Sequence, residues 1–176
     1  PHTDPTPIGD CMKFSDLPLH EDLLRGIADT GFDECLPVQE QTFTHTLNNR
    51  DVFVQSQTGS GKTAAFLISL MQLIKSSEQP KQALIIAPTR ELAVQIKEEA
   101  EALGRHTDLE VACFYGGVGY DQQKKAIERK VSIIVGTPGR LLDLAGSNTL
   151  QMKKISYLVI DEADRLFDMG FLPDIR

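Results

Sequence analysis

Residues 52–63 read Val-Phe-Val-Gln-Ser-Gln-Thr-Gly-Ser-Gly-Lys-Thr, and this stretch decides the fold. Its first three residues are apolar and predict a short strand, while the apolar residues after Thr63 recur at helical spacing. Between them, Gly59 and Gly61 let backbone N–H groups turn inward around a phosphate. The new helix directs its positive end at the same anion, Lys62 adds a point charge, and the Thr63 hydroxyl suits Mg²⁺. A strand, this loop and a helix in that order predict a phosphate loop.

The apolar pattern around this loop predicts a parallel sheet that is covered on both faces. Four further apolar runs read as strands, at residues 83–87, 111–115, 131–135 and 157–160. Helical spacing predicts helices at residues 18–31, 38–47, 64–74, 92–103, 120–130 and 139–145. Strands that are apolar on both faces and alternate with amphipathic helices are typical of an α/β fold with three layers, α/β/α, and a mostly parallel central sheet.

Composition and charge narrow the class of protein. The chain has 176 residues, 41% of them hydrophobic and 24% charged, which excludes disorder of the whole chain. Residues 1–12 read as a flexible tail, and residues 13–176 as one domain. The net charge of −7 argues against binding nucleic acid through a broad positive surface, so any such binding needs a local site.

Several kinds of site and location are not expected. Cys11, Cys35 and Cys113 include no C-x-x-C pair, and the four histidines have no ligand spacing, so neither a disulfide framework nor a zinc site is indicated. No apolar run approaches the length of a membrane span, and no secretory signal is recognisable. We expect an intracellular, cytoplasmic protein without a membrane partner, or a nuclear one in a eukaryote.

A second chemical element follows the run at residues 157–160, where the sequence reads Asp161-Glu162-Ala163-Asp164. A carboxylate at the carboxyl end of a strand, downstream of a phosphate loop, is the partner that holds Mg²⁺ in enzymes that hydrolyse nucleoside triphosphates. Asp161 and Thr63 are therefore the candidate metal ligands, and Glu162 is placed to orient and deprotonate a water. An acidic helix start is the alternative interpretation. With the phosphate loop upstream, we take Lys62, Asp161 and Glu162 as candidate catalytic residues.

These two elements resemble those of DEAD-box ATP-dependent RNA helicases, in their amino-terminal RecA-like domain, and the resemblance runs from Phe14 to the end of the chain. Residues 161–164 spell the motif that names the family. Residues 56–63 resemble its motif I, which usually opens with Ala where this chain has Ser56. The resemblance implies a RecA-like P-loop domain that binds ATP with Mg²⁺. It also implies nucleotide contacts from Gln57, Thr58, Gly59, Ser60, Gly61, Lys62 and Thr63.

Residues 31–39 resemble the Q motif, which reads adenine in this family. By resemblance, Gln39 would hydrogen-bond the adenine edge at two points, because a carboxamide offers both a donor and an acceptor. Phe14 would stack on the adenine face, although an ordinary core position is the alternative for an aromatic residue. The segment departs from the family pattern at Cys35 and at Leu36. Leu36 lacks a hydroxyl that could tie the loop down, which bears on nucleotide affinity.

Three further segments, each placed after a predicted strand, resemble the family's RNA-contact motifs. They combine small hydroxyl or glycine residues near a helix start with a nearby arginine, which suits the sugar-phosphate backbone and reads no bases. Singly, each also fits a turn with a helix cap, but their joint occurrence in this order favours RNA contact. The candidate residues are Pro88, Thr89, Arg90, Gly116, Gly117, Thr137, Pro138, Gly139 and Arg140.

The family pattern continues with a Ser-Ala-Thr motif III and a second RecA-like domain, and no Ser-Ala-Thr occurs in these 176 residues. In such sheets, the strand leading into motif III lies between the phosphate-loop strand and the strand before the DEAD motif. We therefore expect the natural protein to continue beyond Arg176, with the second domain as a partner in cis. The resemblance implies that closure of that domain couples ATP hydrolysis to RNA unwinding or RNP remodelling. The piece alone is expected to be nearly inactive.

Three other functions stay open on the sequence. A GTPase or a small-molecule kinase would also use a phosphate loop, but no guanine-reading Asn-Lys-x-Asp occurs and the Q-motif resemblance favours adenine. A non-catalytic scaffold is disfavoured because Lys62, Asp161 and Glu162 are all present. A DNA-directed helicase would differ in its contacts to the ribose 2′-hydroxyl.

Overall fold

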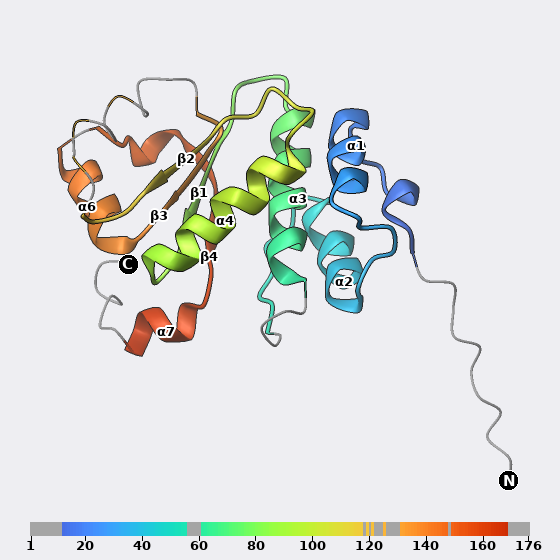
Figure 1. The fold of residues 1–176 in the computed structure, drawn as a ribbon, viewed down its shortest axis with the longest axis horizontal. Helices are drawn as coiled ribbons and strands as arrows, with labels where there is room; N and C mark the ends of the chain where they lie inside the picture. The colour runs from blue at the N-terminus through green and yellow to red at the C-terminus, as the bar shows by residue number, and fades with distance from the viewer. Residues whose placement is uncertain are drawn as a thin grey trace, which may run out of the picture.

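A four-stranded parallel sheet forms the centre of the molecule, with strand order β2-β3-β1-β4 (Figure 1). The structure is a computed structural model and describes residues 12–55, 61–117, 119, 121, 125, 131–147 and 149–168. The strands are β1 (Gln82–Ile86), β2 (Val111–Phe114), β3 (Ile133–Gly136) and β4 (Ile155–Ile160). The helices are α1 (Glu21–Asp29), α2 (Pro37–Thr46), α3 (Lys62–Ser76), α4 (Arg90–Leu103), α6 (Pro138–Gly146) and α7 (Ala163–Asp168), with short 3₁₀ turns η1 (Phe14–Asp16) and η2 (Met152–Lys154).

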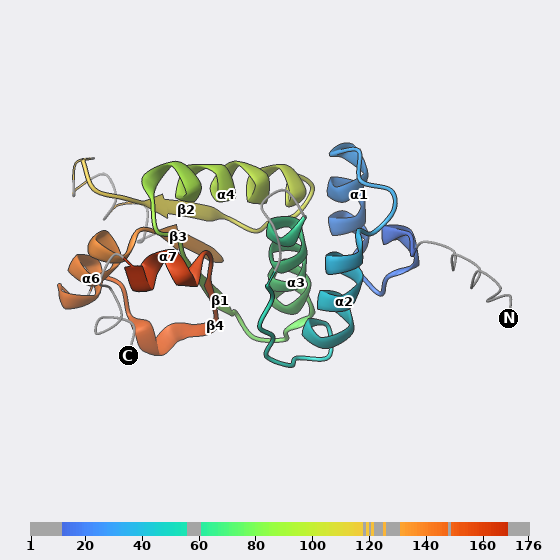
Figure 2. The same cartoon turned by 90° about the horizontal axis from the view of Figure 1, so that it is seen from below.

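Neighbouring residues of β1 face opposite sides of the sheet, and each side has its own hydrophobic core. Ala83 and Ile85 belong to the core that also holds apolar residues of α1, α3 and α4. Leu84 belongs to a second core, together with Leu141 and Leu144 of α6. Figure 2 shows α4 lying along one face of the sheet, with α6 beyond the other. The three-layer α/β/α arrangement expected from the sequence is therefore confirmed.

The helix boundaries follow from local chemistry. The Thr89 side chain accepts a hydrogen bond from the N–H of Leu92 (3.2 Å) and so caps the start of α4. Pro138 occupies the first position of α6, where its missing N–H costs nothing. The helix α7, which the sequence did not predict, begins directly after Glu162. The predicted tail at residues 1–12 and the predicted helix at 120–130 lie largely outside the described residues.

The strand predicted at Val52–Val54 is not formed, and that prediction is wrong for this structure. The segment 51–55 lines one side of a cleft of about 1130 Å³, and β4 lines the other. A strand needs a neighbour that pairs its N–H and C=O groups, and across this cleft the segment has none. Apolar residues revealed a segment suited to a sheet, but they could not reveal whether a partner lies beside it. Phe53 is consequently 87% exposed.

None of the described helices combines the length and the apolar character that a membrane crossing needs.

Gly26 of α1 lies so close to the end of α4 that a Cβ atom there would clash with the Leu103 carbonyl oxygen. We expect Gly26→Ala to push α1 away from α4 and to lower the free energy of unfolding by about 1–3 kcal/mol, although alanine is the better helix former. Gly146→Ala is the matched control, because nothing lies within 4 Å of a Cβ at Gly146. Urea unfolding measures both variants, and equal midpoints would contradict the close packing of α1 on α4.

Candidate functional site

Three successive backbone hydrogen bonds align the carboxyl ends of the four strands. In each, the residue that follows a strand donates its N–H to the last residue of the neighbouring strand. The bonds run from Asp161 to Ile86 (3.0 Å), from Ala87 to Gly136 (2.9 Å) and from Thr137 to Phe114 (3.0 Å). The segments that begin directly after the strands are therefore brought to one edge of the sheet, where parallel α/β proteins bind their ligands.

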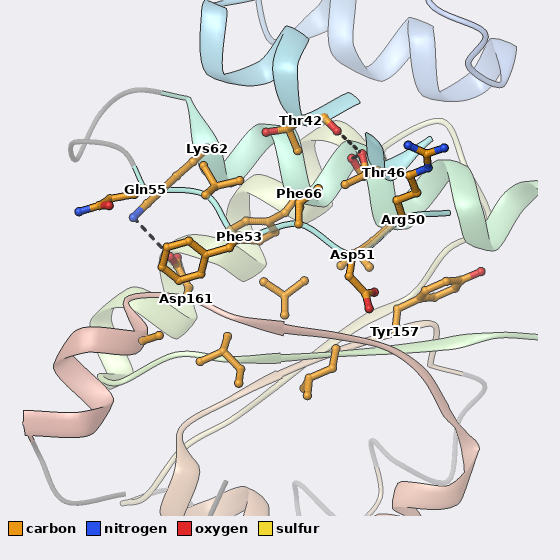
Figure 3. A pocket seen from close by; sticks show the side chains of 18 of the residues that line it. Thr42, Thr46, Arg50, Asp51, Phe53, Gln55, Lys62, Phe66, Tyr157 and Asp161 are labelled. Carbon is orange, nitrogen blue, oxygen red and sulfur yellow. Dashed lines mark hydrogen bonds and ion pairs between the residues drawn. The ribbon is translucent and has the colours of Figure 1, made fainter. Parts of the chain in front are cut away.

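Lys62 and Asp161 face each other across this edge. Lys62 is the first residue of α3, and its Nζ lies 3.6 Å from Oδ1 of Asp161, directly after β4. Figure 3 shows the two side chains meeting at the end of the cleft, next to Phe53. Asp161 is 5% exposed, and its Oδ1 also accepts a hydrogen bond from the N–H of Glu162 (2.9 Å). The ammonium and the carboxylate that the sequence singled out thus form one partly buried pair.

Glu162 occupies a strained backbone conformation. Its φ is +51°, in the left-handed region that non-glycine residues rarely adopt. This conformation costs about 1–2 kcal/mol and persists only where the surroundings hold it. The side chain is 30% exposed, and its Oε2 lies 3.7 Å from Nη1 of Arg165 in α7. The turn between β4 and α7 therefore leaves the Glu162 carboxylate partly solvated and next to Arg165 of α7, which the sequence pattern could not reveal.

Gln39 and Gly61 join the Q-motif segment to the end of the phosphate loop. The fully buried Gln39 accepts a hydrogen bond at Oε1 from the N–H of Leu36 (2.8 Å) and donates one from Nε2 to the carbonyl of Gly61 (3.2 Å). Gly61 has φ +87°, and a Cβ there would lie 2.7 Å from Nε2 of Gln39. Within the part of the chain that the structure describes, the carboxamide has one N–H and one lone pair beyond these two hydrogen bonds. Sequence reasoning missed this contact, although the glycine before the lysine was its signal.

Phe14 is buried among aromatic residues at the base of the Q-motif segment. Its ring is 2% exposed and lies 5.9 Å from the ring of Phe32 and 6.1 Å from that of Phe43, between centroids. Its N–H donates to the carbonyl of Asp33 (2.9 Å), which ties the start of the domain to the segment before α2. In this structure the ring packs as a core residue, and stacking on a base would require it to leave these neighbours.

Leu36 and Cys35 are the two departures from the family pattern in this segment. Leu36 is 44% exposed, and its Cδ1 would lie 2.8 Å from a Cβ at Gly61. Its side chain therefore reaches the phosphate loop through van der Waals contact, in place of a hydroxyl. Cys35 is buried, and desolvation raises the pKa of its thiol to about 11, with Glu40 and Asp16 adding to the effect. Cys35 is accordingly a packing residue and not a reactive thiol.

The residues predicted to contact RNA come together at the ends of β1, β2 and β3. Arg90 opens α4 and is exposed, and its guanidinium carbon lies 4.6 Å from the centre of the Tyr115 ring. Gly117 has φ +87°, and a Cβ there would lie 3.9 Å from Nη1 of Arg90. Thr137 precedes α6 as its N-cap residue, and Arg140 lies in the first turn of that helix. Exposed at the same edge are Gly116, Gly117 and Gly139, whereas Pro88 and Pro138 are buried.

Four of the predicted nucleotide contacts cannot be placed. Gln57, Thr58, Gly59 and Ser60 lie outside the described residues. Thr63 is placed in the first turn of α3, next to Lys62. Tyr115, by contrast, was not singled out from the sequence, even though it directly follows β2 and precedes the Gly-Gly pair.

This fold and this edge define a RecA-like P-loop domain built for a nucleotide. A family model described as DEAD/DEAH box helicase matches residues 36–176. The chain belongs to that family.

Curated relatives agree with this assignment. An ATP-dependent RNA helicase RhlB from Serratia proteamaculans is 48% identical over 173 residues, covering 94% of this chain and 40% of the relative. The protein of the same name from Hamiltonella defensa is 46% identical over 173 residues, covering 94% of this chain and 41% of the relative. The chain thus spans about two fifths of the length of these relatives.

Solved structures confirm the fold. A DEAD box protein from Methanococcus jannaschii superposes with a TM-score of 0.86 at 39% identity, covering 93% of this chain and 45% of that chain. A hypothetical ATP-dependent RNA helicase from Sulfolobus tokodaii superposes with a TM-score of 0.83 at 37% identity, covering 89% of this chain and 45% of that chain.

Gly61→Ala tests the contact between the Q-motif segment and the phosphate loop. The alanine would have to adopt φ +87°, which is strained for a residue with a side chain, and its Cβ would displace Gln39. We therefore expect nucleotide affinity to fall about tenfold or more. Gly139→Ala is the control, because nothing lies within 4 Å of a Cβ there. Titration with a fluorescent ATP analogue in the absence of RNA measures both. Unchanged affinity in Gly61→Ala would show that the contact is not needed for nucleotide binding.

Proposed function

We propose that this chain is the ATP- and RNA-binding domain of an ATP-dependent RNA helicase, which in the longer protein couples ATP hydrolysis to local duplex unwinding or RNP remodelling. The observation that carries the proposal is the pair of Lys62 and Asp161, 3.6 Å apart, with Glu162 adjacent. These are the three groups that phosphoryl chemistry needs, namely a cation for phosphates, a carboxylate for a metal and a carboxylate for water. Membership of the DEAD/DEAH box family supports the same conclusion.

The adenine would be read by the Q-motif segment. Among the described residues, Gln39 makes two hydrogen bonds, which leaves one N–H and one lone pair of its carboxamide and suits a two-point contact to adenine rather than guanine. Phe14 would stack on the base after leaving its aromatic neighbours. Residues 57–63 would surround the phosphates with backbone N–H groups, since α3 starts at their end.

Thr63 and Asp161 would hold Mg²⁺, and their surroundings fit that role. Asp161 is a buried carboxylate whose only described ion-pair partner is Lys62, and hydroxyl and carboxylate oxygens are the ligands that Mg²⁺ takes beside substrate phosphates. Held by these two residues, Mg²⁺ would supply positive charge that offsets the charge of the bound phosphates. Lys62 would then turn from Asp161 toward the same phosphates. The N–H of Glu162 keeps Asp161 oriented throughout.

Glu162 would orient the attacking water and take its proton. Its left-handed backbone fixes the turn that carries the carboxylate, and the partial exposure of the side chain leaves room for a water. A group whose position depends on a strained turn is set by the fold before substrate arrives. Hydrolysis would still await groups from the second RecA-like domain, a partner in cis, so we expect the isolated chain to be nearly inactive.

RNA would lie along the edge formed after β1, β2 and β3. Arg90 and Arg140 offer charge for phosphates, and the exposed glycines allow the backbone to approach closely. Because no side chain in this set is arranged to read bases, we infer sequence-independent binding. The net charge of −7 makes this binding depend on a few placed groups rather than on a general positive field.

The cleft between residues 51–55 and β4 would receive one more parallel strand in the longer protein. Both of its walls carry exposed apolar side chains, with Phe53 87% and Leu158 54% exposed. Among the described strands, β4 pairs with β1 alone, so its other edge carries unpaired N–H and C=O groups. A strand placed there would pair β4 and give residues 51–55 the neighbour they lack.

Hydrogen exchange tests the added strand. The N–H of Asp161 points to β1, so alternation directs the N–H groups of Leu158 and Ile160 toward the cleft. We expect these two amides to exchange slowly in the full-length protein and fast in a chain of residues 1–176. The amides of Leu84 and Ile85 in β1 serve as the control, since they lie in a paired strand in both. Equal, fast exchange at Leu158 and Ile160 in both proteins would contradict the proposal.

Glu162→Gln tests the catalytic assignment in the full-length protein. The amide keeps the shape but cannot take a proton, so we expect ATP binding to persist while RNA-stimulated hydrolysis falls by about 10²–10⁴-fold. Glu101→Gln on the exposed side of α4 is the matched control and should leave turnover unchanged. Phosphate release measures the turnover of both variants. Repeating it with ATP or GTP, and with RNA or DNA of the same sequence, measures the preference for nucleotide and for nucleic acid. Retained RNA-stimulated turnover in Glu162→Gln would refute the role of Glu162.

A further inference from the structure

Tyr115 has no role in the function proposed above, yet it contacts a residue that does. It is the first residue after β2 and is half-buried. Its ring lies 4.6 Å from the guanidinium carbon of Arg90, which comes from the start of α4. A guanidinium over an aromatic face is held by a cation–π attraction, which is strongest where water is partly excluded. The ring therefore joins two of the predicted RNA segments.

The stack leaves Arg90 available for a phosphate. Among the residues that the structure describes, no carboxylate lies within ion-pair distance of Arg90. The face of a guanidinium can rest on a ring while its N–H groups lie in the plane and point outward. An arginine on an exposed helix start would otherwise sample many rotamers. Contact with the Tyr115 ring restricts it before RNA arrives.

The position of the stack places Arg90 beside the Gly-Gly turn. A Cβ at Gly117 would lie 3.9 Å from Nη1 of Arg90, so the guanidinium is next to backbone at the end of β2. Gly117 has φ +87°, and Gly116 is open to solvent. One phosphate could therefore contact the arginine of one segment and the turn of the next.

We propose that Tyr115 is a positioning residue for RNA binding: its ring holds Arg90 over the Gly116–Gly117 turn, so that both segments act on the same stretch of sugar-phosphate backbone. The inference rests on the proposed RNA function of this edge. Tyr115 acts through Arg90 and does not itself bind RNA.

A set of variants of the full-length protein separates these statements. The readout is the affinity for a fluorescein-labelled oligouridylate, measured by anisotropy over a range of KCl concentrations with a non-hydrolysable ATP analogue present. Arg90→Ala should weaken binding and lower the salt slope by about 0.7, the value for one lost phosphate contact on a single strand. If Arg90→Ala has no effect, this RNA segment of the proposed function is wrong, and the inference with it.

Tyr115→Leu removes the ring, and we expect RNA binding about two- to fivefold weaker, with a salt slope that moves toward that of Arg90→Ala. Tyr115→Phe keeps the ring and should bind as the wild type does. In the Arg90→Ala background, Tyr115→Leu should cause no further loss, because its effect passes through Arg90. Melting temperature and ATP-analogue affinity without RNA serve as folding controls, and Tyr115→Met supplies an independent non-aromatic variant.

Three results would overturn the inference while leaving the proposed function in place. An equal loss in Tyr115→Phe would assign the effect to the hydroxyl. Additive losses in the double variant would mean that Tyr115 contacts RNA itself. Wild-type affinity in Tyr115→Leu and Tyr115→Met, alongside weakened Arg90→Ala, would show that the stack does not position the arginine.

Discussion

The carboxyl edge of the sheet depends on the parallel ladder that ends in three aligned backbone hydrogen bonds. The N–H of Asp161 reaches Ile86, and equivalent bonds follow from β1 to β3 and from β3 to β2. Each bond fixes the residue at which one strand stops and its functional segment starts. A shift of one residue in any register would turn the following side chains to the other face. The carboxylate proposed to bind a metal and the edge proposed to bind RNA are thus set by the same ladder.

The outer edge of β4 differs from the two faces of the sheet, and this difference shapes the site. Both faces are covered, because neighbouring residues of β1 enter separate cores. The edge beyond β4 instead borders a cleft of about 1130 Å³. Lys62 and Asp161 lie at one end of that cleft and contact each other across it (Figure 3). Their ion pair bridges two elements, α3 and β4, that no described strand connects.

Short sequence patterns were sufficient to predict most of the architecture, but they carry no information on which distant segments pair with each other. The buried β1 run, the helix that follows the phosphate-loop sequence and the position of Asp161 directly after a strand all follow from short patterns, and the structure places them as predicted. The strand at 52–54 could not be decided this way, since pairing depends on a segment far away in sequence. The buried position of Phe14 and the left-handed φ of Glu162 likewise arise from tertiary packing. Neither feature is marked by a repeating pattern of apolar residues in the sequence.

The hydrogen bond from Gln39 to Gly61 has a thermodynamic consequence. Under the proposed function it makes recognition of the base and binding of the phosphates two parts of one equilibrium, since a ligand that moves either Gln39 or Gly61 changes the other. Linkage then requires reciprocity: the factor by which an occupied base site changes phosphate affinity must equal the factor by which phosphate changes base affinity. Adenosine and pyrophosphate, added together, should therefore report a coupling free energy that neither shows alone. The sign of that coupling distinguishes a loop that releases its nucleotide readily from one that retains it.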